Sequence, residues 1–251
     1  MGENKMNKKA EMTTAQLIGL IVLIVSFAIL LYFLFRLNLG GTTNEEICRN
    51  SVIAVDRTKG TLASLDCRTN YVCISGGDDC SETFSTKVKV NPENKDEIMK
   101  AIADEAVSCW NMFGEGKANY IGPVEGAGIT GGVYCGICST IRFDDKIQEK
   151  TPKITYLEYY NFLQRTKKSD YQTYLNYLYG TSDVGSLRVQ DAFKIVDINN
   201  DFFATREKYS LITGTDTSKN LAGTRREFFG VYIIPTIETP ATSCTDFITK
   251  A

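Results

Sequence analysis

A long apolar run near the N-terminus limits what this chain can fold into more than any other feature. Residues 17–35 read LIGLIVLIVSFAILLYFLF and contain no charged side chain. At about 1.5 Å per residue, such a helix rises roughly 28 Å, close to the hydrocarbon thickness of a bilayer. A helix that is apolar on every face does not suit the surface of a globular domain. The run therefore predicts a transmembrane helix over residues 15–37, with the lipid bilayer as the partner of residues 17–35.

The flanks of this run predict its orientation. Three lysines at positions 5, 8 and 9 precede the run, and Arg36 and Arg49 follow it. Positive residues favour the cytoplasmic side, so we expect a cytoplasmic N-terminus. The run ends in LFRLNLGG, without the small residues of a signal-peptide cleavage site, which favours an uncleaved signal-anchor. The expected division is a cytoplasmic tail (1–14), a transmembrane signal-anchor helix (15–37), a short stalk (38–47) and an ectodomain (48–251).

The cysteines are the second constraint. All eight follow the apolar run, and an even number of cysteines outside the cytoplasm is typical of a disulfide framework. We therefore expect a single-pass protein of the cell membrane whose C-terminal domain is extracellular or periplasmic. The sequence leaves the pairing of these cysteines open: Cys48, Cys67, Cys73, Cys80, Cys109, Cys135, Cys138 and Cys244.

Hydrophobic patterns predict an α+β ectodomain with strands around a helix pair. The clearest helix covers residues 95–113, with Asn94 as its cap, and two shorter helices are expected over 154–165 and 170–179, the second capped by Ser169 and ended by Gly180. Strands are expected at 51–58, 70–75, 84–90 and 133–143 and through the C-terminal third, where the continuous apolar run 228–235 predicts a central strand.

Composition excludes several classes of function. The chain contains no histidine, which excludes Ser-His-Asp and Cys-His catalysis and every His-ligated metal site. The net charge of −2 gives no general attraction to nucleic acid, so we expect no nucleic-acid partner. The sequence also predicts no cofactor, and it leaves enzymatic activity uncertain, favouring none.

Residues 125–138, EGAGITGGVYCGIC, hold two short motifs that bear on chemistry. The first is a G-x-G-x-x-G at Gly126, Gly128 and Gly131. A dinucleotide loop needs a strand before it and a helix after it, whereas Pro123 precedes this motif and a strand-like run follows it. We therefore interpret it as a glycine-rich turn and expect no nucleotide.

The second motif is the C-x-x-C at Cys135 and Cys138. Three readings stay open for it: disulfides, a redox pair, or a zinc site completed by Cys73 and Cys80. Disulfides fit best, because a redox cysteine usually begins a helix and the spacing of Cys73 and Cys80 is wider than in a zinc ribbon. If the strand is regular, Cys135 and Cys138 point to opposite faces and take separate partners.

Two further sets of residues are candidate sites. Asp197, Asn199 and Asp201 have the opening spacing of a calcium loop, although Phe202 stands where such a loop needs glycine. A tyrosine-rich helical segment offers a candidate protein interface, since tyrosine combines an apolar body with a polar tip. Its members are Tyr171, Tyr174 and Tyr177.

The N-terminus permits another reading. Lys9 and Ala10, followed by Glu11 and an apolar helix, resemble the processing site of archaeal prepilins and archaellins, whose N-terminal helices pack into a filament core. That resemblance implies cleavage after Ala10. Polar residues at Thr13 and Thr14 and the bulky aromatics that end the run depart from the pattern.

Two segments carry a second resemblance. The stretch ADEAVSCWNMFGEGK (103–117) and the run CGICSTIRFD (135–144) are similar to segments of uncharacterised single-pass cell-surface proteins of small-genome archaea. The resemblance covers about residues 10–145 and implies topology without a mechanism.

Taken together, the residues predict a membrane-anchored cell-surface or envelope module with a non-enzymatic role in binding a protein partner or in self-assembly. Two alternatives remain. One is a pilin-like or archaellin-like filament subunit processed after Ala10. The other is a tethered thiol–disulfide oxidoreductase that uses Cys135 and Cys138.

Overall fold

The computed structural model describes residues 14–36, 43–58, 62–80, 83–121, 133–187, 201–216, 227–236 and 246–247. The chain divides into two compact units, Met1–Thr42 and Thr43–Ala251, and each is described by itself. The first contains helix α1 (Thr14–Arg36), and the second, called the domain below, contains all other helices and strands.

The large apolar side chains of α1 are exposed. Between residues 17 and 32, where its side chains are described, they are 37% to 67% exposed. Within the described part of the chain, no helix combines the length and the hydropathy that a bilayer crossing needs. This finding contradicts the predicted transmembrane helix over residues 15–37.

The domain begins with helix α2 (Asn44–Thr58), where the sequence predicted a stalk to residue 47 and a strand over 51–58. Thr43 and Glu46 exchange hydrogen bonds at its start, with Glu46 N–H donating to Thr43 Oγ1 at 3.2 Å, which forms a capping box. Cys48, Val52 and Val55 are buried, and their spacing is that of a helix. The strand prediction was wrong because it weighed β-branched residues above this periodicity.

The centre of the domain is a mixed six-stranded sheet. Its strand order is β2-β1-β3-β8-β9, with β10 also paired to β3. The strands are β1 (Asn70–Ser75), β2 (Thr86–Lys89), β3 (Val133–Phe143), β8 (Tyr209–Asp216), β9 (Glu227–Pro235) and β10 (Asp246–Phe247). Strands β2, β1, β3 and β10 run parallel, whereas β8 and β9 are antiparallel to their neighbours. This sheet and its helices confirm the α+β class.

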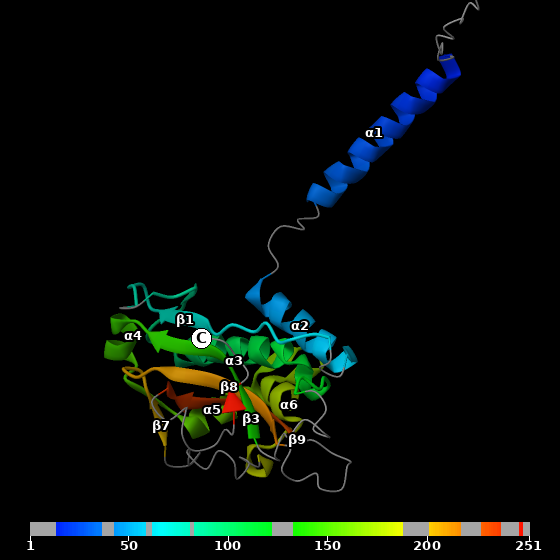
Figure 1. Cartoon of the computed structure of the whole chain (residues 1–251). Helices are drawn as coiled ribbons and strands as arrows, with labels where there is room; N and C mark the ends of the chain where they lie inside the picture. Colours follow the sequence, from blue (N-terminus) through cyan, green and yellow to red (C-terminus); the bar gives the residue numbers. More distant parts are fainter. Residues whose placement is uncertain are drawn as a thin grey trace, which may run out of the picture. The chain divides into compact units, whose positions relative to one another are not determined.

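Helix α3 (Lys95–Met112) is the main support of the sheet. Asn94 Oδ1 accepts hydrogen bonds from the backbone N–H groups of Asp96 (3.1 Å) and Glu97 (3.3 Å), which confirms the predicted cap. The helix packs against β3, β8 and β9 and against α2 (Figure 1). Its apolar stripe forms one core with alternate residues of the strands, among them Val72, Ile141 and Leu211. We call this side of the sheet the helical face and the other side the opposite face.

The remaining elements follow β3 along the chain. Helix α5 begins at a capping box formed by Thr155 and Glu158, close to the predicted start. The predicted helix over 170–179 is shorter than expected: residues 167–173 form a hairpin, and Thr173 replaces Ser169 as the cap. The elements are α4 (Asp145–Lys150), β4 (Lys153–Thr155), α5 (Tyr156–Arg165), β5 (Lys167–Ser169), β6 (Gln172–Thr173), α6 (Tyr174–Tyr179) and β7 (Phe202–Ala204), with short 3-10 turns η1 (Gly114–Gly116) and η2 (Val184–Ser186).

Strand β9 lies at an edge of the sheet in the described part of the chain, and not at its centre as its apolar run predicted. Two tyrosine hydroxyls donate to its backbone carbonyls, Tyr156 to Ile233 at 3.2 Å and Tyr179 to Val231. Helix α6 approaches closely because Gly230 lacks a side chain: a Cβ there would lie 2.7 Å from Tyr179 Cδ1. Tyrosines of α5 and α6 thus bind two carbonyls of this strand, whose residues Val231, Ile233 and Ile234 are buried.

Candidate functional site

The cysteines form a framework around the first half of the domain. Cys48 of α2 is bonded to Cys67, which precedes β1. Cys73 of β1 is bonded to Cys80, which lies beyond the end of that strand, and Cys109 of α3 to Cys138 of β3. The predicted disulfide chemistry is therefore confirmed. The bonded sulfurs belong to residues that are at most 9% exposed.

The C-x-x-C motif does not close on itself. Cys138 is bonded to Cys109, and Cys135 is disulfide-bonded as well. Cys244, the remaining cysteine of the chain, lies outside the described residues. Cys73 and Cys138 belong to different disulfide bonds. The four cysteines of the predicted zinc alternative, Cys73, Cys80, Cys135 and Cys138, are therefore not brought together as a metal site. Neither Cys135 nor Cys138 has measurable solvent exposure.

Several predicted site residues lie outside the described ranges. The glycines at positions 126, 128 and 131 are among them, as are Asp197 and Asn199. Asp201 is described, and its backbone carbonyl accepts a hydrogen bond from Tyr156 N–H at 3.2 Å. Over the described ranges, no three acidic or cysteine side chains come together in a way that could hold a metal ion.

The three tyrosines of the candidate interface occupy different environments. Tyr171 lies at the turn of the β5–β6 hairpin and is 98% exposed. Tyr174 is buried, and its hydroxyl donates to Asp104 at 2.5 Å. Tyr177 is partly buried, with its hydroxyl 2.9 Å from Glu115. The structure therefore places only the hairpin tyrosine fully at the surface.

Tyr177 lies beside charged groups of both signs, Lys168 and Glu115. Lys168 Nζ lies 3.7 Å from the centre of its ring, a cation–π contact. Burial and the neighbouring carboxylate of Glu115 raise the pKa of Tyr177 to about 12. The hydroxyl therefore stays protonated at neutral pH and acts as a hydrogen-bond donor.

A buried carboxylate, Asp144, organises the turn at the end of β1. Burial acts to raise its pKa, but hydrogen bonds to the carboxylate outweigh burial, so the pKa lies below its usual value. Its donors are the backbone N–H groups of Ile147 (3.0 Å) and Asp78 (2.9 Å) and the hydroxyl of Ser75 (3.0 Å). All of these donors belong to the fold, so the carboxylate serves structure.

The pKa of Glu105 is shifted in the opposite direction and lies above its usual value. Glu105 lies on α3 beneath the sheet, and burial raises its pKa, while a hydrogen bond from the hydroxyl of Ser139 at 3.1 Å acts to lower it. Ser139 is only 2% exposed and Glu105 is partly buried, so the pair lies in the packing between α3 and the sheet.

Some of the described residues of the domain surround a hollow. It measures about 460 Å³ and lies where the end of β3 meets the start of β8 and the end of β9. The described residues of its lining are Arg142, Arg206, Glu207, Lys208, Pro235 and Thr236, and we call it the basic pocket. A volume of this size is within the range of small-molecule sites.

Sequence reasoning missed the basic pocket because its residues are scattered. Arg142 is separated from Lys208 by more than sixty residues, among them helices α4, α5 and α6. Only the pairing of β3 with β8 brings them together, and no local motif signals that pairing. The alternation of side chains along β3 and β8 would have been the sole signal.

Comparison with known proteins adds no relative. No family model, no curated protein and no solved structure matches this chain.

Proposed function

We propose that this chain is a disulfide-stapled module that works outside the cytoplasm, with a non-enzymatic role in binding or assembly. The disulfide framework carries the proposal. Three bridges fall within residues 48–138, and each joins parts of the domain that pack together. Such a density of bridges persists in oxidising compartments and is rare in the cytosol.

The state of the sulfurs supports a structural role for these bridges. Thiol–disulfide exchange requires an accessible sulfur, because a thiolate must reach it. Here Cys48, Cys73 and Cys109 have no measurable exposure, and their partners are buried as well. Cys135 and Cys138 are held in separate bridges, so a redox role would require both to open first.

The binding or assembly part of the proposal rests on two exposed features. The β5–β6 hairpin presents Tyr171 at its turn, flanked by exposed charged and polar residues 167–170. An exposed tyrosine of this kind is frequent in protein interfaces. The other feature is α1, whose apolar side chains would be stabilised by contact with another apolar surface.

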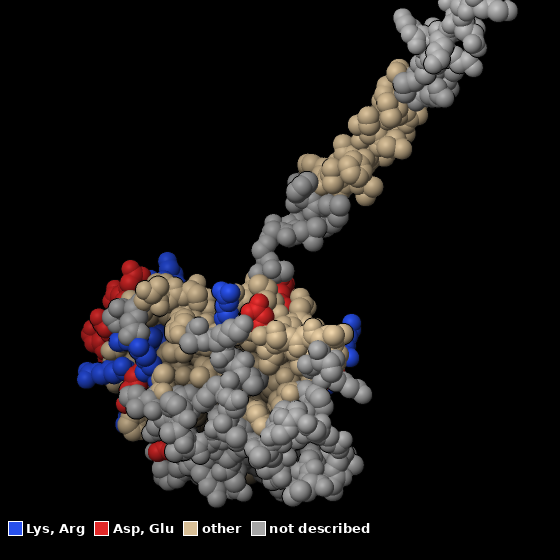
Figure 2. Space-filling view, viewed as in Figure 1, with Lys and Arg blue, Asp and Glu red and all other residues tan. Residues whose placement is uncertain are grey.

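A filament subunit is the second candidate function, and α1 is the observation that favours it. Figure 2 shows α1 free of lysine, arginine, aspartate and glutamate wherever it is coloured. Such helices from several copies could pack side by side and cover each other. Cleavage after Ala10 and contact between residues 17–35 and lipid both stay predictions from the sequence.

The test is the thiol state of the chain in the cells that express it. Cells are quenched in acid, and free thiols are labelled with a maleimide polymer before and after reduction. We expect no mass shift before reduction and eight additions after it. A Cys109→Ala, Cys138→Ala variant is the matched control and should take six. Labelling of the unreduced wild-type chain would contradict the proposal. An intact mass equal to that of a chain starting at Glu11 would favour the filament subunit.

A further inference from the structure

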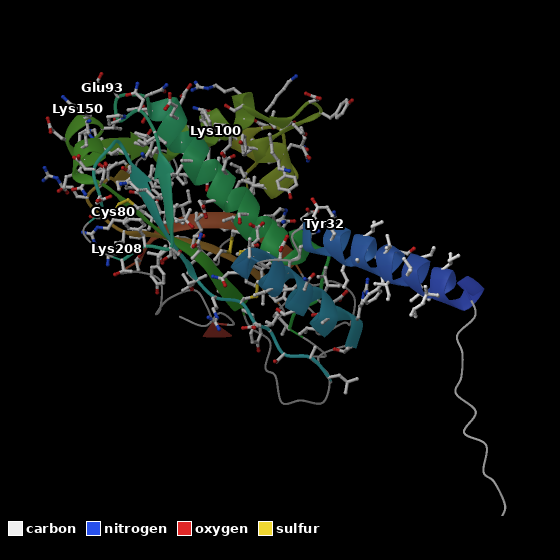
Figure 3. The ribbon with its side chains drawn as sticks, turned by 90° about the horizontal axis from the view of Figure 1, so that it is seen from above. Tyr32, Cys80, Glu93, Lys100, Lys150 and Lys208 are labelled. Atoms are coloured by element: carbon white, nitrogen blue, oxygen red, sulfur yellow. A yellow bond between two sulfur atoms is a disulfide. The ribbon has the colours of Figure 1, made fainter. Side chains whose placement is uncertain are left out.

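The turn of the β5–β6 hairpin presents the most exposed large hydrophobic residue of the described part of the chain. This residue is Tyr171, which is 98% exposed. Ser169 of β5 lies opposite Gln172 of β6, so the turn between the strands has only two residues. All of residues 167–171 are exposed. Figure 3 shows the yellow-green ribbon of this hairpin reaching outward past the helices near the labelled Lys100. The turn is therefore accessible to another protein surface.

Contacts at its base hold the hairpin in one orientation. The backbone N–H of Tyr174 donates to the carbonyl of Thr166 at 3.1 Å, and the hydroxyl of Tyr174 donates to Asp104 of α3. Lys168 Nζ lies 3.7 Å from the centre of the Tyr177 ring on α6. The hairpin is thus tied to two helices, so its turn loses little conformational freedom when it binds.

Two opposite charges accompany Tyr171 in the hairpin. Lys167 and Asp170 are exposed, and within the described ranges neither of them forms an ion pair. Lys168 differs, because its ammonium group lies against the ring of Tyr177. Apart from the lysine that contacts α6, the hairpin therefore offers one aromatic ring, one cation and one anion.

Such a set of groups is its own complement. A two-fold axis near the turn can set Lys167 of each copy against Asp170 of the other and place the two Tyr171 rings in contact. Both ion pairs then form by symmetry. A partner surface of a single charge sign would instead oppose one of these two charged residues. The charges of the hairpin thus favour a second copy of the chain over a partner that is uniformly acidic or basic.

We propose that the β5–β6 hairpin joins two copies of this chain through a two-fold contact centred on Tyr171. This contact rests on the assembly role proposed above and names the partner. Five exposed residues in each copy make a small contact, and small contacts are weak by themselves. The hairpin therefore acts between copies that another interaction already holds close together, where the effective concentration is high.

Photo-oxidative cross-linking of the full chain tests this contact. A ruthenium trisbipyridyl complex, persulfate and light join tyrosine rings that touch, and a nonionic detergent covers the apolar side chains of α1. A linkage between two Tyr171 residues must join two copies, because each chain has only one. At about 100 μM protein, a concentration that populates weak contacts, we expect this linkage to be the main tyrosine–tyrosine product in the tryptic digest.

Charge reversal separates the proposed contact from chance collisions between exposed rings. Lys167→Glu and Asp170→Lys each turn two attractive pairs into repulsive ones, so each should lower the yield of the Tyr171 linkage roughly three- to tenfold. An equal mixture of the two variants should restore the yield to near that of the wild type, since opposite charges again face each other across the axis. The restored linkage should join one copy of each variant, which the masses of the linked peptides distinguish.

Lys89→Glu is the matched control, because it makes the same change of charge at an exposed residue of β2. Its linkage yield should equal that of the wild-type chain, and near-ultraviolet circular dichroism checks that every variant is folded. The hairpin contact is overturned if the Tyr171 linkage is absent, if the charge-reversed variants keep the wild-type yield, or if their mixture stays low. Linkages between copies at other tyrosines alone would also overturn it but leave the assembly role standing, and the thiol labelling tests the compartment separately.

Discussion

At the scale of single residues, Asp144 shows how a short sequence determines a turn. The segment Ser75–Asp79 reads SGGDD. The carboxylate of Asp144 accepts hydrogen bonds from a hydroxyl group and from a backbone N–H group of this segment. Gly77 adopts a φ of 135°, which only glycine tolerates readily. The turn therefore depends on a charge that lies about seventy residues away in the sequence.

We expect Asp144→Asn to destabilise the domain by about 1–3 kcal/mol at neutral pH, because the amide cannot accept all of these hydrogen bonds. The pKa of Asp144 is lowered in the folded state. Its stabilisation is therefore present above the unfolded-state pKa, near 4, and is lost as the pH falls through the folded-state pKa. Urea unfolding between pH 7 and pH 3 measures this, and the gap between wild type and variant should narrow toward acid.

Asp145→Asn is the control for this prediction, since Asp145 is the exposed neighbour in α4. Its effect should stay within about 0.5 kcal/mol at every pH. A gap for Asp144→Asn that does not change with pH would show that the charge of the carboxylate has no part in holding the turn.

At the scale of elements, the sequence predicted the strongly patterned segments well. The strand over 70–75, the helix that Asn94 caps and the strand over 133–143 all have regular spacing and clear ends. Gly180 ends α6 with a φ of 68°, as its position predicted. These elements are determined locally, by caps, turns and periodicity.

The wrong predictions concern elements whose position in the sheet depends on tertiary contacts. The continuous apolar run of β9 predicted a central strand, and its burial is real, since Val231, Ile233 and Ile234 are at most 4% exposed. Tyrosines on α5 and α6 cover strand β9, and no local sequence pattern reveals that these tyrosines contact the strand. Strand β2, the other edge of the described sheet, instead carries Lys87 and Lys89, a usual protection against pairing with another chain.

Tyr179→Phe tests the protection of the β9 edge. Removing the hydroxyl leaves the carbonyl of Val231 without this donor, and we expect a loss of about 1–2 kcal/mol in the free energy of unfolding. Tyr159→Phe is the matched control. The Tyr159 hydroxyl is buried without a hydrogen-bond partner among the described residues, so its removal should leave stability unchanged or raise it. Equal losses in both variants, measured by thermal unfolding, would refute the role of the Tyr179 hydroxyl.

At the scale of the whole molecule, the disulfide framework and the sheet support each other. The Cys109–Cys138 bridge joins α3 to β3, and the two other bridges tie α2 and the turn after β1 to the same region.

In Figure 2, charged side chains of both signs gather on the side of the domain where α4 lies. The visible charge is therefore mixed, which suits a surface without a strong single-sign field.

The candidate sites were harder to predict than the fold. Cysteine count alone indicated disulfides, but the pairs depend on which strands and helices meet. The basic pocket depends on the register between β3 and β8, which local patterns do not set. The tyrosine spacing suggested one face, whereas the hairpin turn separates Tyr171 from Tyr174 and Tyr177.

The central claim is a stapled domain in an oxidising compartment, and a disulfide map of the native protein tests it most directly. The protein is alkylated at lysis, digested without reduction and analysed by mass spectrometry. We predict the linkages Cys48–Cys67, Cys73–Cys80 and Cys109–Cys138. Cys135 is disulfide-bonded as well, so we expect no free thiol at this position. Alkylated thiols at these positions, or a Cys135–Cys138 linkage, would contradict the account.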